Sequence, residues 1–204
     1  MSDRFPDGFF ARADETRDRE FYEPVRLVTH IDDGAIAAVG DLYEELGLRG
    51  DVLDVMSSWV SHFRVAPQRL VALGMNAYEL ARNEQAVGAV VADLNAYPQL
   101  PFRDNAFDAA VCCVSIDYLV RPVEVFHAVH EVLRAGAPFV CTFSNRCFPT
   151  KAIRGWLLTY DDTHREIVAE YFRRCGGWED VHSEIRRPGG RGRDPLYAVW
   201  ARRG

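Results

Sequence analysis

The stretch RDNAFDAAVCCVSIDYLVRPVEVFHAVHEVLRAGAP, residues 103–138, indicates the fold of this chain. Within it, the apolar run AAVCCV at 109–114 has the composition of a buried strand. Residues 123–133 repeat apolar side chains at helical spacing, and an Arg-Ala-Gly turn at 134–136 follows them. A second apolar run, PFVCTFS, begins at residue 138. A strand, a helix and another strand in this order predict a βαβ unit of a parallel sheet.

The segments on either side continue the alternation and predict one α/β domain over residues 34–204. Helices of 8–14 residues between buried strands are typical of a doubly wound, mostly parallel sheet covered on both faces. We expect seven strands, the last pair antiparallel, and two further long helices with Asp32 or Asp33 and Asp161 or Asp162 as their N-caps. The remaining strands are predicted at 51–56, 69–73, 89–92, 178–184 and 195–201, and the remaining helices at 34–46, 77–83 and 161–174.

Composition narrows the classes of function. The net charge of −6 argues against a general nucleic-acid surface, and no apolar run approaches the roughly 18 residues that a membrane span needs. The N-terminus is charged, so we expect no signal peptide and a cytoplasmic protein. Five cysteines without a Cys-x-x-Cys pair, and histidines without an i, i+4 pair, predict no metal site. We expect residues 1–33 to form an arm or lid, of which residues 1–20 are loosely held, and the sequence carries no signal for an oligomeric state.

Several motifs in this order resemble the class I S-adenosylmethionine (SAM)-dependent methyltransferase family, of the methyltransferase type 11 kind. They are Val52-Leu53-Asp54 at the end of one strand, Asp93 followed by Leu100-Pro101-Phe102, then Ala106-Phe107-Asp108 and the helix end at 132–137. The resemblance covers roughly residues 50–145 and implies a Rossmann-like methyltransferase fold. It also implies SAM as cofactor and methyl transfer to an acceptor. With about 100 residues outside the match, a small-molecule acceptor is favoured over a protein or nucleic acid.

Two positions depart from the family pattern. Met56, Ser58 and Val60 stand where the family has the three glycines of Val-Leu-Asp-x-Gly-x-Gly-x-Gly, and the β-branched Val60 is poorly suited to positive φ. Gly74 stands where the family has the acid that binds the ribose hydroxyls, and Asn76 is the nearest polar side chain. Asn76 is equally suited to cap a helix that begins at the next residue. These departures leave open an alternative function, a catalytically inactive methyltransferase fold that acts as a ligand-binding or interaction module.

The resemblance and the strand ends together select the candidate site residues. In open parallel sheets ligands bind beyond the carboxyl ends of the strands. Each substrate candidate also has a structural alternative: Asp117 as a helix cap, Tyr118 as a packed ring, Arg146 in a surface ion pair and His30 as a polar packing residue. The cofactor candidates are Asp54, Met56, Ser58, Asn76, Asp93, Leu94 and Ser115, and the candidates that face the substrate are Asp117, Tyr118, Arg146 and His30.

Overall fold

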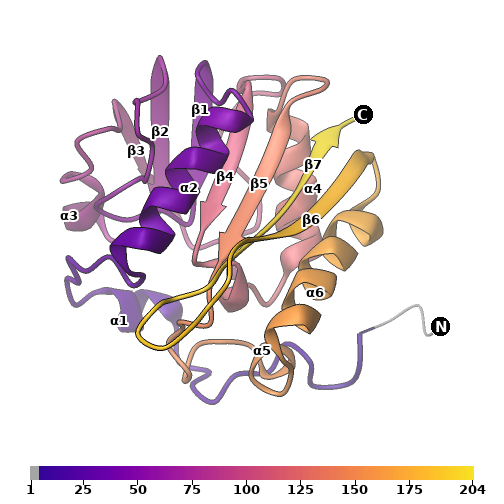
Figure 1. Ribbon diagram of the computed structural model, residues 1–204. Coiled ribbons are helices and arrows are strands. Elements are labelled where there is room, and N and C mark those ends of the chain that lie inside the picture. The colour runs from indigo at the N-terminus through magenta and orange to yellow at the C-terminus, as the bar shows by residue number, and fades with distance from the viewer. Residues whose placement is uncertain (1–4) are drawn as a thin grey trace.

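A computed structural model describes residues 5–204 and confirms the predicted sheet (Figure 1). Seven strands lie in the order β3-β2-β1-β4-β5-β7-β6, with β7 antiparallel to both of its neighbours and the others parallel. The order reverses between β1 and β4, which is the switch point where open α/β sheets bind ligands. The strands are β1 (Asp51–Val55), β2 (Arg69–Gly74), β3 (Gly88–Val91), β4 (Ala109–Cys113), β5 (Pro138–Phe143), β6 (Trp178–Arg187) and β7 (Leu196–Arg203).

Helices cover the two faces of the sheet unequally. The strands alternate their side chains, so that Ala110 and Cys112 of β4 join one apolar core while Ala109 and Val111 join the other. Helices α4 and α6 pack on the first core, and α2 packs on the second. The helices are α1 (Asp18–Tyr22), α2 (Asp33–Glu45), α3 (Ala77–Leu80), α4 (Pro122–Val132), α5 (Arg154–Leu157) and α6 (Asp161–Cys175), with a 3₁₀ turn η1 (Ile116–Tyr118).

The expected regular alternation of strands with helices of 8–14 residues is correct only for the second half of the chain. The connection from β1 to β2, residues 56–68, contains no helix, and neither does the connection from β3 to β4. Between β2 and β3 the helix α3 has four residues. Parallel strands need a crossover of about a dozen residues but not a helical one. The first half of the sheet therefore has irregular connections at the strand ends.

The helix caps agree with the sequence at one helix and differ at another. Asp32 Oδ1 accepts a hydrogen bond from Ala35 N at 2.8 Å, which confirms it as the N-cap of α2. At α6 the N-cap is Tyr160, so the prediction of Asp161 or Asp162 as cap is wrong by one or two positions. The carboxylate of Asp161 instead accepts a hydrogen bond from the Tyr197 hydroxyl at 2.7 Å. This tertiary contact has no local signal in the sequence.

Residues 5–20 are attached to the domain, so the expectation that residues 1–20 are loosely held is wrong for these sixteen positions. Phe5 and Phe10 contact the ring of the buried Tyr171, at 5.7 and 6.4 Å between centroids. Arg154 N and Gly155 N at the start of α5 donate to backbone carbonyls of this segment at 2.7 and 2.8 Å. The apolar spacing of three phenylalanines near the N-terminus was the available signal. Residues 1–4 lie outside the described part of the chain.

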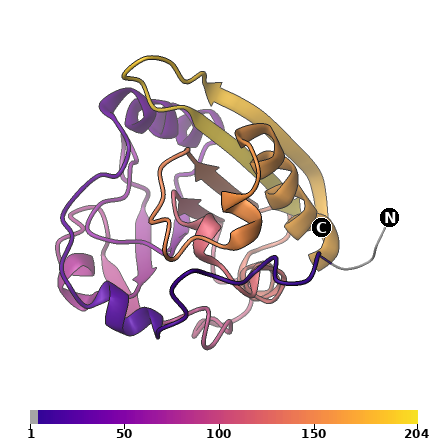
Figure 2. The same ribbon diagram turned by 90° about the horizontal axis from the view of Figure 1, so that it is seen from below.

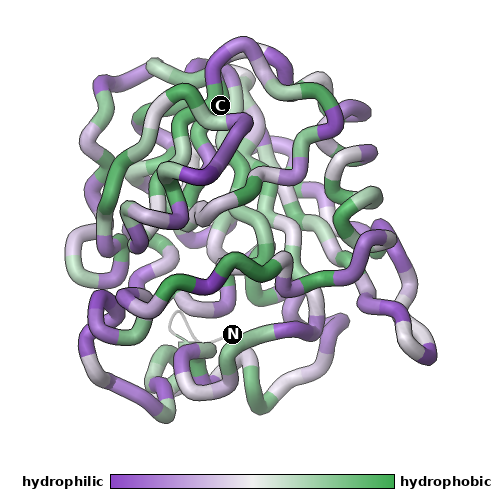
Figure 3. The backbone as a smooth tube through the Cα atoms, turned by 90° about the vertical axis from the view of Figure 1, so that its left-hand side faces the viewer, coloured by the Kyte–Doolittle hydropathy of each residue, from purple (hydrophilic) through white to green (hydrophobic). Residues whose placement is uncertain are grey.

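The apolar residues concentrate in the central strands, and the hydrophilic ones in the outer loops (Figure 3). Among residues 5–204 no helix has the length and apolarity that crossing a membrane requires.

Two of the motifs, Ala106-Phe107-Asp108 and the helix end at 132–137, lie at one edge of the sheet, where the strands begin. Asp108 Oδ2 accepts a hydrogen bond from Asp51 N at 2.8 Å, and Arg134 pairs with both Asp108 and Asp51. Arg134 N also donates to Phe107 O at 2.9 Å, which joins the end of α4 to the start of β4. Hydrogen bonding to Arg69 lowers the pKa of Asp51 from its ordinary value. These residues hold the sheet together at its amino-terminal edge, and none of them lines the cavity described next.

Candidate functional site

A cavity of about 320 Å³ lies at the opposite edge, where β1, β2, β3 and β4 end. Its volume is in the range of small-molecule sites. The N-terminal segment runs along this edge in Figure 1, and Figure 2 looks onto it, with that segment and the segment after β5 nearest the viewer. Ten of the eleven predicted site residues line the cavity: His30, Asp54, Met56, Ser58, Asn76, Asp93, Leu94, Ser115, Tyr118 and Arg146.

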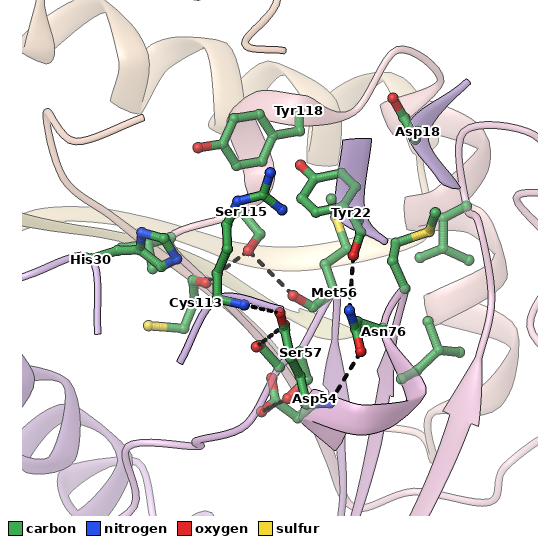
Figure 4. Close-up of a pocket in the computed structure, with 18 of the residues that line it drawn as sticks. Asp18, Tyr22, His30, Asp54, Met56, Ser57, Asn76, Cys113, Ser115 and Tyr118 are labelled. Atoms are coloured by element: carbon green, nitrogen blue, oxygen red, sulfur yellow. Dashed lines mark hydrogen bonds between the residues drawn. The ribbon is translucent and has the colours of Figure 1, made fainter. Parts of the chain in front are cut away.

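Asp54 organises the loop that follows β1 (Figure 4). Its Oδ2 accepts hydrogen bonds from the hydroxyls of Ser57 and Ser61, at 2.7 and 2.5 Å, and Asn83 Nδ2 donates to Ser61 Oγ at 2.8 Å. Burial raises the pKa of Asp54 to about 6, although both serine hydroxyls oppose the rise. The hydroxyls of Ser57 and Ser61 thus bind one oxygen of the Asp54 carboxylate. These hydrogen bonds fold the loop back over the end of its own strand.

Only the first of the three glycine-replacing residues has a glycine-like backbone. Met56 has φ of 58°, in the left-handed region, whereas Ser58 and Val60 are not among the described residues with positive φ. Val60, which as a β-branched residue is poorly suited to positive φ, does not adopt it here. The chain leaves β1 through a left-handed residue, as a glycine would, and carries a methionine side chain there at the cost of local strain.

The two departures from the family pattern, Gly74 in place of the ribose-binding acid and the altered loop after β1, are linked in the structure. Ser57 N donates to Leu73 O at 2.7 Å, which places the backbone of the loop directly against the end of β2. A Cβ atom added to Gly74 would lie 2.0 Å from Ser57 O, closer than any real contact. An aspartate cannot replace Gly74 while the loop keeps this path.

Glu79 supplies an acid to the same region, and sequence reasoning missed it. Its Oε2 accepts a hydrogen bond from Ser58 Oγ at 2.6 Å, its Oε1 accepts one from Arg26 N at 2.6 Å, and the residue lines the cavity. The signal in the sequence was the spacing Asn76-x-x-Glu79, which is that of a capping box. A capping box would turn the glutamate back to its own helix, whereas here its carboxylate links the N-terminal segment to the loop after β1.

The alternative role for Asn76, as a helix cap, is confirmed. Its Oδ1 accepts hydrogen bonds from Tyr78 N and Glu79 N at 3.0 and 3.2 Å. Its Nδ2 donates to the carbonyls of Tyr22 and Glu23 at 2.9 and 3.0 Å. Figure 4 shows this amide beneath Tyr22. Asn76 therefore fixes the N-terminal segment over the cavity, and both ends of its amide are engaged.

Asp93 and Leu94 follow β3 as the resemblance implied. Asp93 Oδ1 accepts hydrogen bonds from Asn95 N and Ala96 N, both at 3.0 Å, and so closes a tight turn. Leu94 is buried beside it. Asn95 extends the arrangement, because its Nδ2 donates to Asp18 Oδ2 at 2.7 Å and to Tyr118 O at 2.9 Å. This turn thereby connects the third and fourth strand ends to the N-terminal segment.

A buried ion network holds that segment in place. Asp18 pairs with Arg12 at 2.6 Å and with Lys151 Nζ at 3.3 Å, and Lys151, whose side chain is 0% exposed, also pairs with Asp14 at 3.3 Å. Lys151 Nζ further donates to Thr16 O at 2.7 Å. Removing one partner of such a network leaves a buried charge uncompensated, which is costly. The wall of the cavity formed by α1 is therefore part of the folded domain.

The loop after β4 carries a second strained residue. Val114 lines the cavity with φ of 45°, a conformation that β-branched residues rarely adopt. Ser115 Oγ donates to Met56 O at 3.2 Å and Cys113 O at 3.1 Å, so it joins the ends of β4 and β1. Strained backbone that persists at two adjoining strand ends is typical of ligand sites.

Asp117 is the one predicted residue that does not line the cavity. It is 3% exposed, and its Oδ2 is buried without a hydrogen-bond partner in the described chain. Burial raises its pKa to about 8, so the side chain is mostly protonated at neutral pH. The 3₁₀ turn η1 directs the neighbouring Tyr118 to the cavity instead, and the Tyr118 hydroxyl accepts a hydrogen bond from Phe148 N at 2.8 Å. The predicted role of Asp117 as a substrate-facing base thus stays a prediction for a side chain that does not line the cavity in this structure.

His30 and Arg146 both line the cavity and are both exposed. His30 has φ of 64°, its ring lies 5.1 Å from that of Phe148, and burial lowers its pKa. Arg146 Nε contacts Asp194 Oδ1 at 2.8 Å, so the ion pair considered as an alternative exists and the residue also lines the cavity. In residues 5–204 no three His, Cys, Asp or Glu side chains gather as metal ligands would.

Comparisons with known proteins agree with the fold. Residues 55–141 match the family model described as a methyltransferase domain. No curated protein sequence matches the chain. A SAM-dependent methyltransferase from Mesorhizobium loti is 16% identical, with a TM-score of 0.56 over 81% of this chain and 98% of that one.

Two further solved structures resemble the chain at a TM-score of 0.61 and 17% identity. One is the 1,6-didemethyltoxoflavin-N1-methyltransferase of Burkholderia thailandensis, bound to 1,6-didemethyltoxoflavin and S-adenosylhomocysteine, with 84% of this chain and 79% of that chain covered. The other is the [4+2]-cyclase SpnF, with 82% and 81% covered. Residues 55–141 therefore match a methyltransferase domain, and the strand order and overall fold resemble those of SAM-dependent methyltransferases.

Proposed function

We propose that the protein transfers a methyl group from SAM to a small-molecule acceptor. The observation that carries the proposal is the cavity at the switch point, to which the ends of β1, β2, β3 and β4 all contribute. The Burkholderia methyltransferase, a protein of the same fold, binds the small molecule 1,6-didemethyltoxoflavin. The N-terminal segment closes one side of the cavity, which favours a small acceptor. The buried free thiols suit a cytoplasmic protein.

The cofactor candidates fit SAM in this cavity. Met56 keeps the left-handed turn of the family's first glycine, and Asp93 and Leu94 are positioned for the adenine amino group and ring face. We assign the ribose hydroxyls to Glu79, because Gly74 is held side-chain-free by Ser57 O. When bound, SAM supplies an activated methyl group. Asp54, Ser58 and Ser115 would then border it, and Asn76 would act by holding the wall above it.

The residues of the chain contribute positioning more than acid–base chemistry. Tyr118 presents an aromatic face to the cavity, and such faces attract cationic groups. His30, whose pKa is lowered by burial, is neutral at pH 7 and is suited to accept a proton from an acceptor hydroxyl or amine. Arg146 would contact the acceptor from the loop after β5. Holding the two reactants in line accounts for most of the acceleration in such a reaction.

Thermal unfolding with SAM and with S-adenosylhomocysteine tests the proposal. Ligand at about 100 times its dissociation constant stabilises a folded protein by roughly 2.7 kcal/mol. For a domain of this size that is a rise in melting temperature of about 5–10 °C. Unchanged melting at millimolar concentrations of both compounds would refute it.

A second candidate is a methyltransferase fold that no longer transfers methyl groups. Ser57 O against Gly74 favours it, since the loop occupies space that the family gives to the ribose acid. The similarity to a protein named a [4+2]-cyclase is compatible with another use of the fold. It predicts binding of an organic ligand without any response to SAM.

A further inference from the structure

Arg26 is a guanidinium without a counter-ion at the cavity mouth. Its backbone N is fixed by Glu79, and its side chain donates through one nitrogen to Pro24 O at 3.0 Å. The guanidinium carbon lies 4.6 Å from the centre of the Phe21 ring and 5.5 Å from that of Phe148. Arg26 is half-buried, lines the cavity and forms no ion pair within residues 5–204. A planar fork held by two rings, with unused donors, is suited to bind a carboxylate or phosphate.

The acids that share the cavity accept hydrogen bonds from other groups of the chain, and none of them pairs with the Arg26 side chain. Asp18 is neutralised by Arg12 and Lys151, and Glu79 accepts hydrogen bonds from Ser58 Oγ and Arg26 N. The carboxylate of Asp54 is bound by two serine hydroxyls, and Asp93 closes its own turn. Arg146, which also lines the cavity, pairs through its Nε with Asp194. The carboxylates beside these two guanidiniums are Asp194, which pairs with Arg146, and Glu79, which binds the Arg26 backbone N, and neither pairs with the Arg26 side chain.

Aromatic rings form the walls around these cations. Phe148 has three ring neighbours, Phe21 at 5.3 Å, His30 at 5.1 Å and Tyr118 at 5.9 Å between centroids. Rings at such distances and angles offer flat apolar surfaces to a planar guest. Figure 4 shows Tyr118, Tyr22 and His30 around one end of the cavity, opposite Asp54.

We propose that the acceptor is a planar, ring-bearing molecule with an anionic group, carboxylate or phosphate, and that Arg26 binds this group beside Phe148. The proposal rests on the proposed function in that it places the acceptor at the Phe148 end and the cofactor at the Asp54 and Asp93 end. Arg26 sets specificity: it selects acceptors by charge and leaves the reacting group to face the cofactor end.

Ligand-detected NMR titrations of the full chain test the charge preference. The probes are benzoate, phenyl phosphate and the neutral benzamide, each measured with and without saturating S-adenosylhomocysteine. We expect at least one anion to bind about tenfold or more tightly than benzamide, the effect of one charge-assisted contact. The stronger of the two anions identifies which group the site prefers. If the wild-type protein binds benzamide and both anions with equal affinity, the proposal is overturned, and no variant is needed to show it.

Two arginine variants assign the preference to Arg26. Arg26→Gln should remove it, and Arg26→Lys should retain part of it through charge without the planar fork. The matched control is Arg82→Gln, because Arg82 also stacks on a ring, that of Tyr78 at 3.2 Å, but lies outside the cavity lining. A preference that persists in Arg26→Gln would refute the assignment.

The two proposals fail separately. If S-adenosylhomocysteine binds and the anions gain nothing over benzamide, the acceptor inference is wrong and the proposed function stands. If the anions bind through Arg26 and S-adenosylhomocysteine does not bind, the proposed function is wrong. The cavity then binds anions for an activity other than methyl transfer.

Discussion

The pKa values of acidic side chains are shifted in opposite directions at the two edges of the sheet. At the amino-terminal edge, the pKa of Asp51 is lowered by hydrogen bonding to Arg69, and its network with Arg134 is partly exposed to solvent. At the carboxyl-terminal edge, burial raises the pKa of Asp54 to about 6 and that of Asp117 to about 8. The first edge is stabilised by its charges, whereas the second is destabilised by holding carboxyl groups away from water.

The two edges also differ in how closely their residues follow the family pattern. The amino-terminal edge carries Ala106-Phe107-Asp108 and the helix end at 132–137, which follow the family pattern. The cavity edge keeps Asp54 and Asp93 but departs from the pattern in the loop after β1, and Met56, Val114 and His30 of the cavity lining have positive φ. A protein that tolerates buried acids and strained backbone at one edge needs compensating stability elsewhere, and the Asp51–Asp108–Arg134 network contributes to it.

The largest expected effect is on the pH dependence of stability, through Asp117. Between about pH 4 and 8 the folded state retains a proton that the unfolded chain has lost, so the free energy of unfolding falls as pH rises. The fall is about 1.4 kcal/mol per pH unit, or on the order of 5 kcal/mol over the window. Asp117→Asn cannot lose this proton, and its urea-unfolding free energy should be nearly flat from pH 6.5 to 8.

Asp54 also makes the free energy of unfolding fall with pH, but only up to about pH 6. The range from pH 6.5 to 8 therefore isolates the contribution of Asp117. The control is Asp162→Asn, at a side chain that is 83% exposed, and it should keep the wild-type slope. A wild-type slope in Asp117→Asn would mean that this carboxyl is ionised in the fold.

Gly74→Ala tests the close approach of the first loop. The new Cβ would meet Ser57 O, a backbone atom that cannot move without the loop, and we expect a loss of about 3 kcal/mol. In a thermal melt this is a decrease of about 6–12 °C. Gly88→Ala is the matched control in the next strand, because its Cβ would meet only Val71 Cγ2 at 3.9 Å. Equal melting of the two variants would disprove the loop's path.

Asp93→Ala should weaken S-adenosylhomocysteine binding in calorimetry by roughly 1–3 kcal/mol, the usual loss for a buried polar contact. Asp93→Asn separates the ligand role from the turn, since an amide oxygen can still accept from Asn95 N and Ala96 N. We expect the asparagine variant to melt like the wild type and to bind as weakly as the alanine variant. Undiminished binding in both would remove the adenine from this loop.

The smallest effect is expected at the amino-terminal edge. Asp108→Ala removes the acceptor of Asp51 N and a partner of Arg134, and should cost about 1–2 kcal/mol in unfolding free energy. Binding of S-adenosylhomocysteine should stay unchanged, because distant sites act independently. Asp104→Ala, at an exposed neighbour, should alter neither quantity. A change in affinity at Asp108 would show that the two edges are coupled.

Periodicity predicted the sheet, its closing pair and the long helices, since these follow from local patterns of burial. It also predicted which loops meet, because parallel strands bring their carboxyl ends to one edge. It could not predict Glu79, Asp18 or Lys151, each of which binds at least one partner between 21 and 137 residues away in sequence. The place of Asp117 outside the cavity lining could not be predicted for a related reason: a single 3₁₀ turn decides which of two adjacent side chains faces the cavity.

Lys151 has a practical consequence beyond its ion pairs. It is the chain's one lysine, and its amine is enclosed by residues 14–18. An amine-reactive dye can therefore modify a lysine only when the N-terminal segment has left the cavity wall. The rate of labelling at Lys151, followed by peptide mapping to separate it from labelling of the α-amine, would report how often the segment opens, and a bound ligand that holds the wall closed would lower that rate.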